Sequence, residues 1–548
     1  MKKARKHEST KARRRESTKA RKYEKGILHS CPRAFVPSCF FLLCMILLLN
    51  PLSIFSQSKQ SQKKAIDCTA DRLVYDANIK EGVKILYDNV VFMHEGAICY
   101  ADTAYLNENL NTIDAYGQNL VIHVNDSVTL YGTHLQYNGD TKQAYIDCNV
   151  RMESKNAVLY ANKLEYDRVN DVAYYNNSGR IESGESVLVS KQGWYYTAKD
   201  EVYFKKDVNL TTPEYIIDSD TLKYNTLTEI AYFLGPTVIH SDADSIYCEY
   251  GWYETYTDVC EFQENARMYN QTQCLSADTL WYDKPNDIGI ARRNVSISDT
   301  VENMLFFGQY AEYKKKEGFA YLTDSAVAVM VDKHDSLFMH SDVMYVLFDS
   351  NQQVENFQAY YNVRFFREDL QGSSDSVVYI AEDSVICFFN SPIMWSKENQ
   401  LLADTIRMYI KDRVISEIHY INNASIFADV FEQEKFNQVK GEIMIAYFKD
   451  NEIDFVYIDG SAEALYYLQE DNKDLIGVQK STSSQIKVFF EESEIAIIRM
   501  YENVKGKVYP LEQLDNDKLN GFIWLEEYRP KTKESIFENI IYRAVKEE

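Results

Sequence analysis

The sequence predicts an all-β fold, an elongated β-solenoid or extended jelly-roll of about 13 two-strand repeats, followed by a short C-terminal α element. Three observations predict it. A short phrase of the type Ala-Asp-x-Leu-x-Tyr-Asp recurs along the chain, and a second phrase with Asn or Gly before a β-branched pair follows each copy. Residues that favour strands are abundant, with 42 Tyr among 548 residues, whereas 9 Pro and 20 Gly are too few for a disordered or collagen-like chain.

The first phrase opens with a small residue, and its copies lie 28 to 33 residues apart as far as Ala403 and 38 and 43 residues apart beyond it. Clear copies are ADRLVYD from Ala70, ANKLEYD from Ala161, SDTLKYN from Ser219 and ADTLWYD from Ala277. The second phrase reads AYIDCNVRM or AYFLGPTVI in two of the repeats. No helical periodicity is present inside the unit, so each repeat is expected to contain two strands and two turns.

The apolar residues of the first phrase change parity in its middle. Leu159 and Ala161 share one face of a straight strand, whereas Leu164 and Tyr166 share the other. A bulge or corner near the Asp or Asn of the phrase would direct both pairs into one core. We expect the Asp or Asn to hydrogen-bond local backbone at this corner.

The first 56 residues are predicted to be a signal peptide. Residues 1–33 carry 13 Lys or Arg and 3 Glu, and residues 39–49 form an apolar run of the length found in secretory signals. We place cleavage near Ser56; the alternative is an uncleaved anchor spanning residues 34–55. Residues 57–467 form the predicted repeat domain, and residues 468–548 a modified rung with a capping helix. Seven scattered cysteines remain after the signal and are expected to be small buried residues.

The C-terminal helix is predicted from Ile536, Phe537, Ile540 and Ile541, which share one helical stripe. Repeat proteins need a cap over their last open edge, so we expect this helix to be the cap. The alternative is a docking helix for a partner or a membrane surface.

Sequence motifs for catalysis are absent: the chain has no HExxH, GxSxG, P-loop or GxGxxG pattern and no Cys-His metal spacing. We therefore predict no catalytic residues, no metal site and no cofactor. The net charge of −23 also argues against a nucleic-acid partner. Asp followed by Ser or Thr and a small or apolar residue is similar to the acceptor pattern of O-glycosylation of exported proteins in some Gram-negative bacteria. Outside the repeat phrase, this pattern makes Thr300 and Ser336 O-glycosylation candidates.

The repeated two-phrase unit resembles that of the OstA/LptA organic-solvent-tolerance family over about residues 66–467. The resemblance implies an open, twisted β-jelly-roll that binds lipopolysaccharide or a related glycolipid in the periplasm and passes it toward the outer membrane. It also implies end-to-end stacking of copies or contact with other envelope transport proteins. Two features depart from the family: the chain is longer than the short bridge proteins, and its body is strongly acidic, which disfavours a phosphorylated lipid unless divalent cations mediate.

On this interpretation the protein is a non-enzymatic periplasmic bridge, with association with the outer membrane as a further expectation. Acyl chains would lie in a hydrophobic β trough lined by Leu135, Tyr137, Leu164, Tyr166, Leu222, Tyr224, Leu280 and Tyr282. The alternative is a structural or partner-binding envelope β-solenoid that binds no lipid. A carbohydrate-active β-helix enzyme is a third hypothesis, for which the sequence contains no clustered acid pair.

The basic and apolar start gives the first testable prediction. Cell fractionation is expected to find the protein in the periplasm, and N-terminal sequencing is expected to show that residues 1–56 have been removed. An intact N-terminus in the inner membrane would contradict it.

Overall fold

The computed structural model describes residues 64–538, except 76–81, 155–156, 243, 333–334, 352, 412–413, 432–433, 450–451, 471–473, 492–493 and 514–515. Contacts between residues divide the chain into two units, residues 1–62 and residues 63–548, and the description below concerns the second unit. The predicted signal peptide and residues 539–548, which include Ile540 and Ile541, lie outside the described residues.

The described residues form 36 strands. The first twelve are β1 Asp67–Thr69, β2 Arg72–Tyr75, β3 Val83–His94, β4 Ala97–Asn107, β5 Thr112–Asn125, β6 Val128–Asn138, β7 Gln143–Glu153, β8 Val158–Asp167, β9 Val172–Tyr175, β10 Gly179–Ser183, β11 Ser186–Ser190 and β12 Gln192–Tyr196. The next twelve are β13 Glu201–Thr211, β14 Ile216–Asn225, β15 Ile230–Phe233, β16 Thr237–His240, β17 Ser245–Cys248, β18 Tyr250–Glu254, β19 Val259–Tyr269, β20 Gln273–Asp283, β21 Ile288–Asp299, β22 Met304–Lys314, β23 Phe319–Met330 and β24 Leu337–Phe348. The last twelve are β25 Val354–Arg367, β26 Leu370–Ile380, β27 Val385–Phe389, β28 Ile393–Ser396, β29 Asn399–Leu402, β30 Thr405–Lys411, β31 Val414–Phe431, β32 Lys435–Lys449, β33 Glu452–Gln469, β34 Leu475–Glu491, β35 Glu494–Tyr501 and β36 Lys505–Tyr509.

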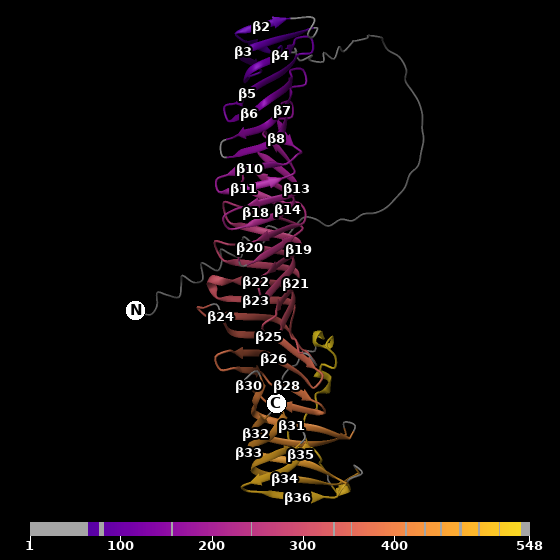
Figure 1. Ribbon diagram of the computed structural model, residues 1–548. Coiled ribbons are helices and arrows are strands. Elements are labelled where there is room, and N and C mark those ends of the chain that lie inside the picture. Colours follow the sequence, from indigo (N-terminus) through magenta and orange to yellow (C-terminus); the bar gives the residue numbers. More distant parts are fainter. Residues whose placement is uncertain are drawn as a thin grey trace, which may run out of the picture. The chain divides into compact units, whose positions relative to one another are not determined.

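The strands confirm the predicted all-β fold. They belong to one sheet in which each strand pairs antiparallel with neighbours in the sequence, and Figure 1 shows them following one another in chain order. The described helical elements are four 3-10 helices: η1 Lys315–Glu317, η2 Leu511–Gln513, η3 Glu526–Tyr528 and η4 Ser535–Phe537. The described part of the predicted C-terminal helix is therefore the single turn η4. The strands continue to Tyr509, so the predicted boundary at residue 467 marks a change in sequence and not an end of the sheet.

A corner divides each repeat, as the parity change predicted. Between β3 and β4, Tyr87 pairs with Thr103 and Val90 with Ala101, so two residues of β3 lie opposite one residue of β4. Those two residues, Asp88 and Asn89, have φ of 61° and 50°. Similar two-residue left-handed corners occur at 148–149, 206–207, 264–265, 293–294, 324–325 and 422–423. Asn tolerates this conformation better than most residues, which explains the Asn of the second phrase.

The Asp of the first phrase lies opposite this corner and accepts a hydrogen bond from the corner Asn of the next long strand. Asn294 Nδ2 donates to Asp278 Oδ1 at 3.0 Å, and Asn362 Nδ2 donates to Asp342 Oδ2 at 2.8 Å. The same pairing joins Asn89 to Asp71, Asn390 to Asp375 and Asn423 to Asp404. These bonds run between side chains of neighbouring strands, whereas the sequence predicted bonds to local backbone. They explain why the two phrases recur together.

The corners fold the sheet into two half-sheets that enclose one interior. We call them the tyrosine half-sheet, which carries Leu164 and Tyr166 in β8, and the aliphatic half-sheet, which carries Leu159 and Ala161 of the same strand. All four residues pack into one core cluster, and Leu164 is 1% exposed. The parity argument is confirmed, because the corner turns both sets of side chains inward.

The C-terminal segment after β36, residues 510–538, returns along the outer face of the aliphatic half-sheet. Leu519 packs with Leu465 and Tyr467, and farther along the segment Leu525 packs with Ile393 and Trp395. Ile536 then packs with Val327 and Val329 of β23. Figure 1 shows this yellow segment beside β25 and β26.

The segment therefore covers a face of the sheet, whereas the sequence predicted a cap over the last edge. Two fully buried glutamines explain the difference. The side-chain amide of each one donates a hydrogen bond to a backbone carbonyl of the segment and accepts one from a backbone N–H of the segment. Gln438 donates to Asp517 O at 2.7 Å and accepts from Leu519 N at 2.8 Å. Gln400 makes the same pair of bonds with Ile523 O and Leu525 N.

The outer face that the segment covers differs from its counterpart earlier in the chain. A single cross-strand row there reads Gln371, Trp395, Gln400, Phe427, Gln438 and Leu465. In the earlier strands the corresponding row reads Glu153, Val158, Glu182, Val187 and Thr211. The later strands therefore present large apolar side chains that need a cover, and the segment supplies it.

The corner gives a prediction about stability. Leu164→Asp is expected to lower the thermal midpoint severely, because it buries an unpaired charge in the core. Lys163→Asp changes the neighbouring exposed side chain and is expected to cost less than about 1 kcal/mol. Equal shifts of the two variants in a thermal melt would contradict the arrangement of the half-sheets.

The buried glutamines give a prediction about the C-terminal segment. Gln438→Ala is expected to speed hydrogen exchange in residues 510–538, because two buried backbone groups lose their partners at about 1–3 kcal/mol each. Gln136→Ala, which removes an exposed glutamine of β6, is the matched control and should leave that exchange unchanged. Unchanged exchange in both variants, measured by mass spectrometry, would show that the amide bonds do not hold the segment.

Candidate functional site

The interior between the half-sheets is the candidate site. On the tyrosine half-sheet, the last Tyr of each first phrase alternates across the strands with a small residue of the second phrase. The row reads Tyr137, Ala144, Tyr166, Ala173 and Tyr195 in the first part. It continues as Tyr224, Ala231, Tyr253, Cys260, Tyr282, Gly289 and Tyr313 after Val202. The small residues leave room for the rings, which explains the Ala that opens the second phrase.

The row of tyrosines lies beside the hairpin turns, where the two half-sheets end. Tyr282 Oη donates a hydrogen bond to Asp287 Oδ1 at 3.0 Å, and Tyr253 donates to Asp258 in the preceding repeat. Burial, together with the bond to Asp287, raises the pKa of Tyr282 to about 12. These hydroxyls are therefore neutral donors at neutral pH, so the boundary of the interior carries phenols beside carboxylates.

The residues that the sequence predicted as lipid-lining all point into the interior. Those that are buried are Leu135, Tyr137, Leu164, Tyr166, Leu222 and Leu280, whereas Tyr224 and Tyr282 are half-buried and pack against the core. Their inward position follows from the corner. Contact with lipid stays a prediction.

In the first core cluster, side chains fill most of the space that these residues line. A cavity of about 40 Å³ lies among Phe92, Ile122, Leu135, Tyr137 and Tyr166. This volume suits at most a few water molecules and is far too small for an acyl chain. An acyl chain would therefore enter only if the half-sheets part or the side chains move.

The interior contains two separate core clusters, one from Ile66 to Tyr175 and one from Leu188 to Val488. Tyr175 lies at the end of the first cluster, with its hydroxyl 2.7 Å from Ser190 Oγ. A Cβ at Gly179 or Gly193 would come within 2.4 or 2.5 Å of its ring, so only glycine fits at both positions. The ring of Tyr175 therefore closes the interior at this level.

Charged side chains connect the hairpin turns of the two half-sheets. Arg168 donates to His94 O and Glu95 O at 3.0 Å each, and Lys142 forms an ion pair with Glu95 at 2.6 Å. His94 is buried and its Nδ1 lies 2.6 Å from Tyr137 Oη.

A second bridge joins Lys284 Nζ to Glu214 at 3.0 Å. The hydrogen bond to Glu214 raises the pKa of Lys284, so this bridge stays charged at neutral pH. The sequence does not reveal such contacts, because 70 or more residues separate Arg168 from His94 and Lys284 from Glu214.

Sites for metal or modification were also predicted or excluded from the sequence. Within the described ranges, no group of three or more His, Cys, Asp or Glu could hold a metal ion, and no helix is long and apolar enough to span a membrane. Thr300 is exposed in the turn after β21, and Ser336 is half-buried before β24. Modification of either residue stays a prediction. The seven described cysteines are free. Cys99, Cys248, Cys260 and Cys387 are buried as expected, whereas Cys68 and Cys274 are half-buried and Cys148 is exposed, contrary to the expectation.

The repeat unit is similar to known proteins. The sequence model of the family described as OstA-like protein matches residues 62–220 and 223–328, together slightly less than half of the chain. Among solved structures, the chain is similar to LptH from Pseudomonas aeruginosa, the LptA homologous periplasmic component of the conserved lipopolysaccharide transport device. The identity is 17%, the match covers 20% of this chain and 80% of LptH, and the TM-score is 0.19. No curated protein matches the chain.

The family match includes the tyrosine row and the first of the repeats with corners and Asp–Asn bonds described above, and the same architecture continues past residue 328 to β36. The resemblance to the OstA/LptA family that the sequence indicated is therefore confirmed by the match to the OstA-like family over residues 62–220 and 223–328.

Proposed function

We propose that the protein is a periplasmic lipid-binding bridge of lipopolysaccharide export and outer-membrane biogenesis. Acyl chains of an outer-membrane glycolipid would lie between the tyrosine and aliphatic half-sheets. The observation that supports this most is the apolar interior of a repeat that matches the OstA-like family. The corners close this interior on one side, and only hairpin turns flank it on the other.

The energetics of such binding need no specific polar pocket. Burial of an acyl chain of about a dozen CH₂ groups contributes up to roughly 10 kcal/mol before costs, at about 0.8 kcal/mol per group. The inward Leu, Ile, Val and Tyr side chains supply the apolar surface. Parting of the half-sheets costs part of this free energy, because packed side chains must separate and bridges such as Lys284–Glu214 must break.

The ends of the stack support assembly with other copies or with other envelope transport proteins. Among the described strands, β2 pairs only with β3, and β36 pairs only with β34. Leu73 and Tyr75 of β2 are 53% and 56% exposed, and Val508 of β36 is 59% exposed. Unpaired edge strands with apolar side chains are templates for pairing with a further strand. The location that fits this role is the periplasm, with contact at the outer membrane.

The filled interior favours a second candidate function, a structural or partner-binding solenoid without lipid. Its support is the burial of Leu135, Leu164, Leu222 and Leu280 among their neighbours and the small size of the cavity. In that case the exposed edges would be the functional surfaces. The two candidates differ in one observable, which is lipid between the half-sheets.

Photo-crosslinking distinguishes them with a matched pair in one strand. A benzoylphenylalanine at Tyr166, whose ring points inward, is expected to capture lipopolysaccharide in cells that export the protein. The same residue at Tyr160, on the outer face of β8 and 40% exposed, is the control and is expected to capture none. Because an aromatic residue replaces an aromatic residue in both variants, folding should be preserved.

A second inward position, Tyr282, tests the later core cluster. Adducts are identified by mass spectrometry of the purified protein. If the variants are exported and folded but carry no lipid adduct at Tyr166 or Tyr282, the lipid-carrier function is rejected and the structural function remains.

A further inference from the structure

The outer face of the tyrosine half-sheet carries an aromatic row that neither the fold nor the interior requires. Cross-strand partners in this row are Tyr174, Trp194, Tyr203, Lys223, Tyr232, Trp252, Glu261 and Trp281. Three of the five Trp of the chain lie in it, and all its aromatic side chains are half-buried. Lys223 Nζ lies 5.5 Å from the ring centre of Tyr203 and 5.2 Å from that of Tyr232. Aromatic rings gathered on an outward face are typical of binding surfaces.

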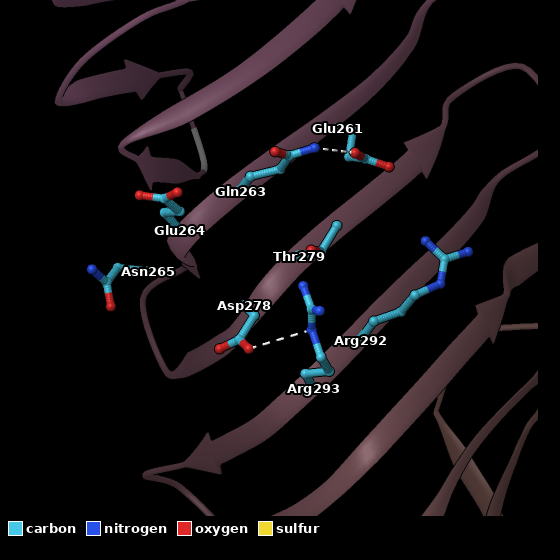
Figure 2. A pocket seen from close by; sticks show the side chains of 8 residues that line it. All are labelled: Glu261, Gln263, Glu264, Asn265, Asp278, Thr279, Arg292 and Arg293. Carbon is cyan, nitrogen blue, oxygen red and sulfur yellow. Dashed lines mark hydrogen bonds and ion pairs between the residues drawn. The ribbon is translucent and has the colours of Figure 1, made fainter. Parts of the chain in front are cut away.

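A cleft of about 740 Å³ opens beside this row at β19, β20 and β21 (Figure 2). Thr279 lies in its middle, between its cross-strand partners Gln263 and Arg292. Toward the corner, the cleft is lined by Glu264, Asn265, Asp278 and Arg293, and on the other side by Glu261. The volume is within the range of small-ligand sites.

Aromatic side chains surround this polar cleft on the same outer face. Trp252 and Trp281 are both cross-strand partners of Glu261. Tyr250 is the partner of Gln263, and Tyr310 is the partner of Arg292. Side chains directly opposite each other on one face lie about 5 Å apart, so these rings stand beside the polar groups.

The lining combines hydrogen-bond donors and acceptors of nearly balanced charge. Gln263 Nε2 donates to Glu261 Oε1, and Arg293 pairs with Asp278 at 3.4 Å, as Figure 2 shows. Arg292 is exposed and has no hydrogen bond or ion pair with other residues that the structure describes. Three carboxylates and two guanidinium groups thus share the cleft, together with two amides and one hydroxyl.

This composition selects among ligand classes. All eight lining residues are polar, whereas the cores of protein interfaces are depleted in charged residues. A polyanion such as a nucleic acid would meet three carboxylates against two arginines. A sugar chain fits both features, because its hydroxyl groups donate and accept hydrogen bonds and the C–H faces of its rings pack on aromatic rings.

We propose that this cleft binds a segment of a carbohydrate chain. One sugar ring packs against Trp281, and neighbouring hydroxyl groups bond to Glu261, Gln263 and the free guanidinium of Arg292. The site lies on the face opposite the interior, so the proposal does not depend on acyl-chain binding. The carbohydrate can be the sugar part of a glycolipid or a chain without lipid, such as a cell-wall glycan.

Binding is tested with the mature full-length protein and two lipid-free probes. One probe is the oligosaccharide released from lipopolysaccharide by mild acid, and the other is a soluble peptidoglycan fragment. We expect at least one of them to bind in isothermal titration and to change the tryptophan fluorescence. The probe that binds identifies the source of the carbohydrate, and binding of neither overturns the proposal.

Variants then locate the site. Trp281→Ala and Arg292→Gln are each expected to weaken binding by roughly tenfold or more, because each removes a contact that the solvent does not replace fully. Trp194→Ala is the matched control, since Trp194 lies in the same aromatic row but on β12, and it should leave the affinity unchanged. Thermal melts of all three variants report whether they fold.

Parent-like affinity in folded Trp281→Ala and Arg292→Gln variants would also overturn the proposal. Lipid crosslinking at Tyr166 in the Trp281→Ala background is expected to persist. This separates the carbohydrate site from the lipid-carrier function, because each can fail without the other.

Discussion

The structure depends on the corners of the repeats, at most of which residues with positive φ on one strand lie opposite a single residue on the next. Without them, Leu159 and Leu164 would point to opposite sides of a straight strand, and neither half-sheet could contribute a continuous apolar face. The bond between the Asp of one strand and the Asn of the next fixes the corner in register, as between Asp278 and Asn294. Stacking then repeats this geometry, because each unit can bury its apolar face only against its neighbours.

The interior follows directly from this arrangement. Each corner places a Tyr of the first phrase at the end of the tyrosine half-sheet, and the small residue of the second phrase makes room for its ring. The same packing that stabilises the stack also fills space between the half-sheets, and in the first core cluster it leaves a cavity of about 40 Å³. Stability and the proposed lipid binding would therefore compete for one volume, and bridges such as Lys284–Glu214 join the hairpin turns of the two half-sheets.

The outer faces of the two half-sheets differ in what covers them. The aliphatic half-sheet is polar on its outside in the early strands and apolar in the later ones, where the C-terminal segment covers it through Gln400 and Gln438. The glutamine amides bond to the backbone of the segment, so this contact requires few particular side chains in the segment. The tyrosine half-sheet instead leaves its aromatic row and the cleft at Thr279 uncovered, which is why the carbohydrate site is proposed there.

The sequence by itself determined the strands, the repeat, the corner and the inward direction of residues such as Leu164 and Tyr282, because all of these are set by neighbours within about ten positions along the chain. The same local phrases also indicated the resemblance to the OstA/LptA family, which the family match over residues 62–220 and 223–328 supports. Only the tertiary structure decided how tightly the interior is packed and which hairpin turns Arg168 and Lys284 connect. It also decided which backbone groups bond to the side chain of Gln438. Those contacts join residues 70 or more positions apart, and their distance depends on how the strands stack and twist, which no local pattern encodes. The cleft around Thr279 has the same origin, since its polar side chains meet only across neighbouring strands.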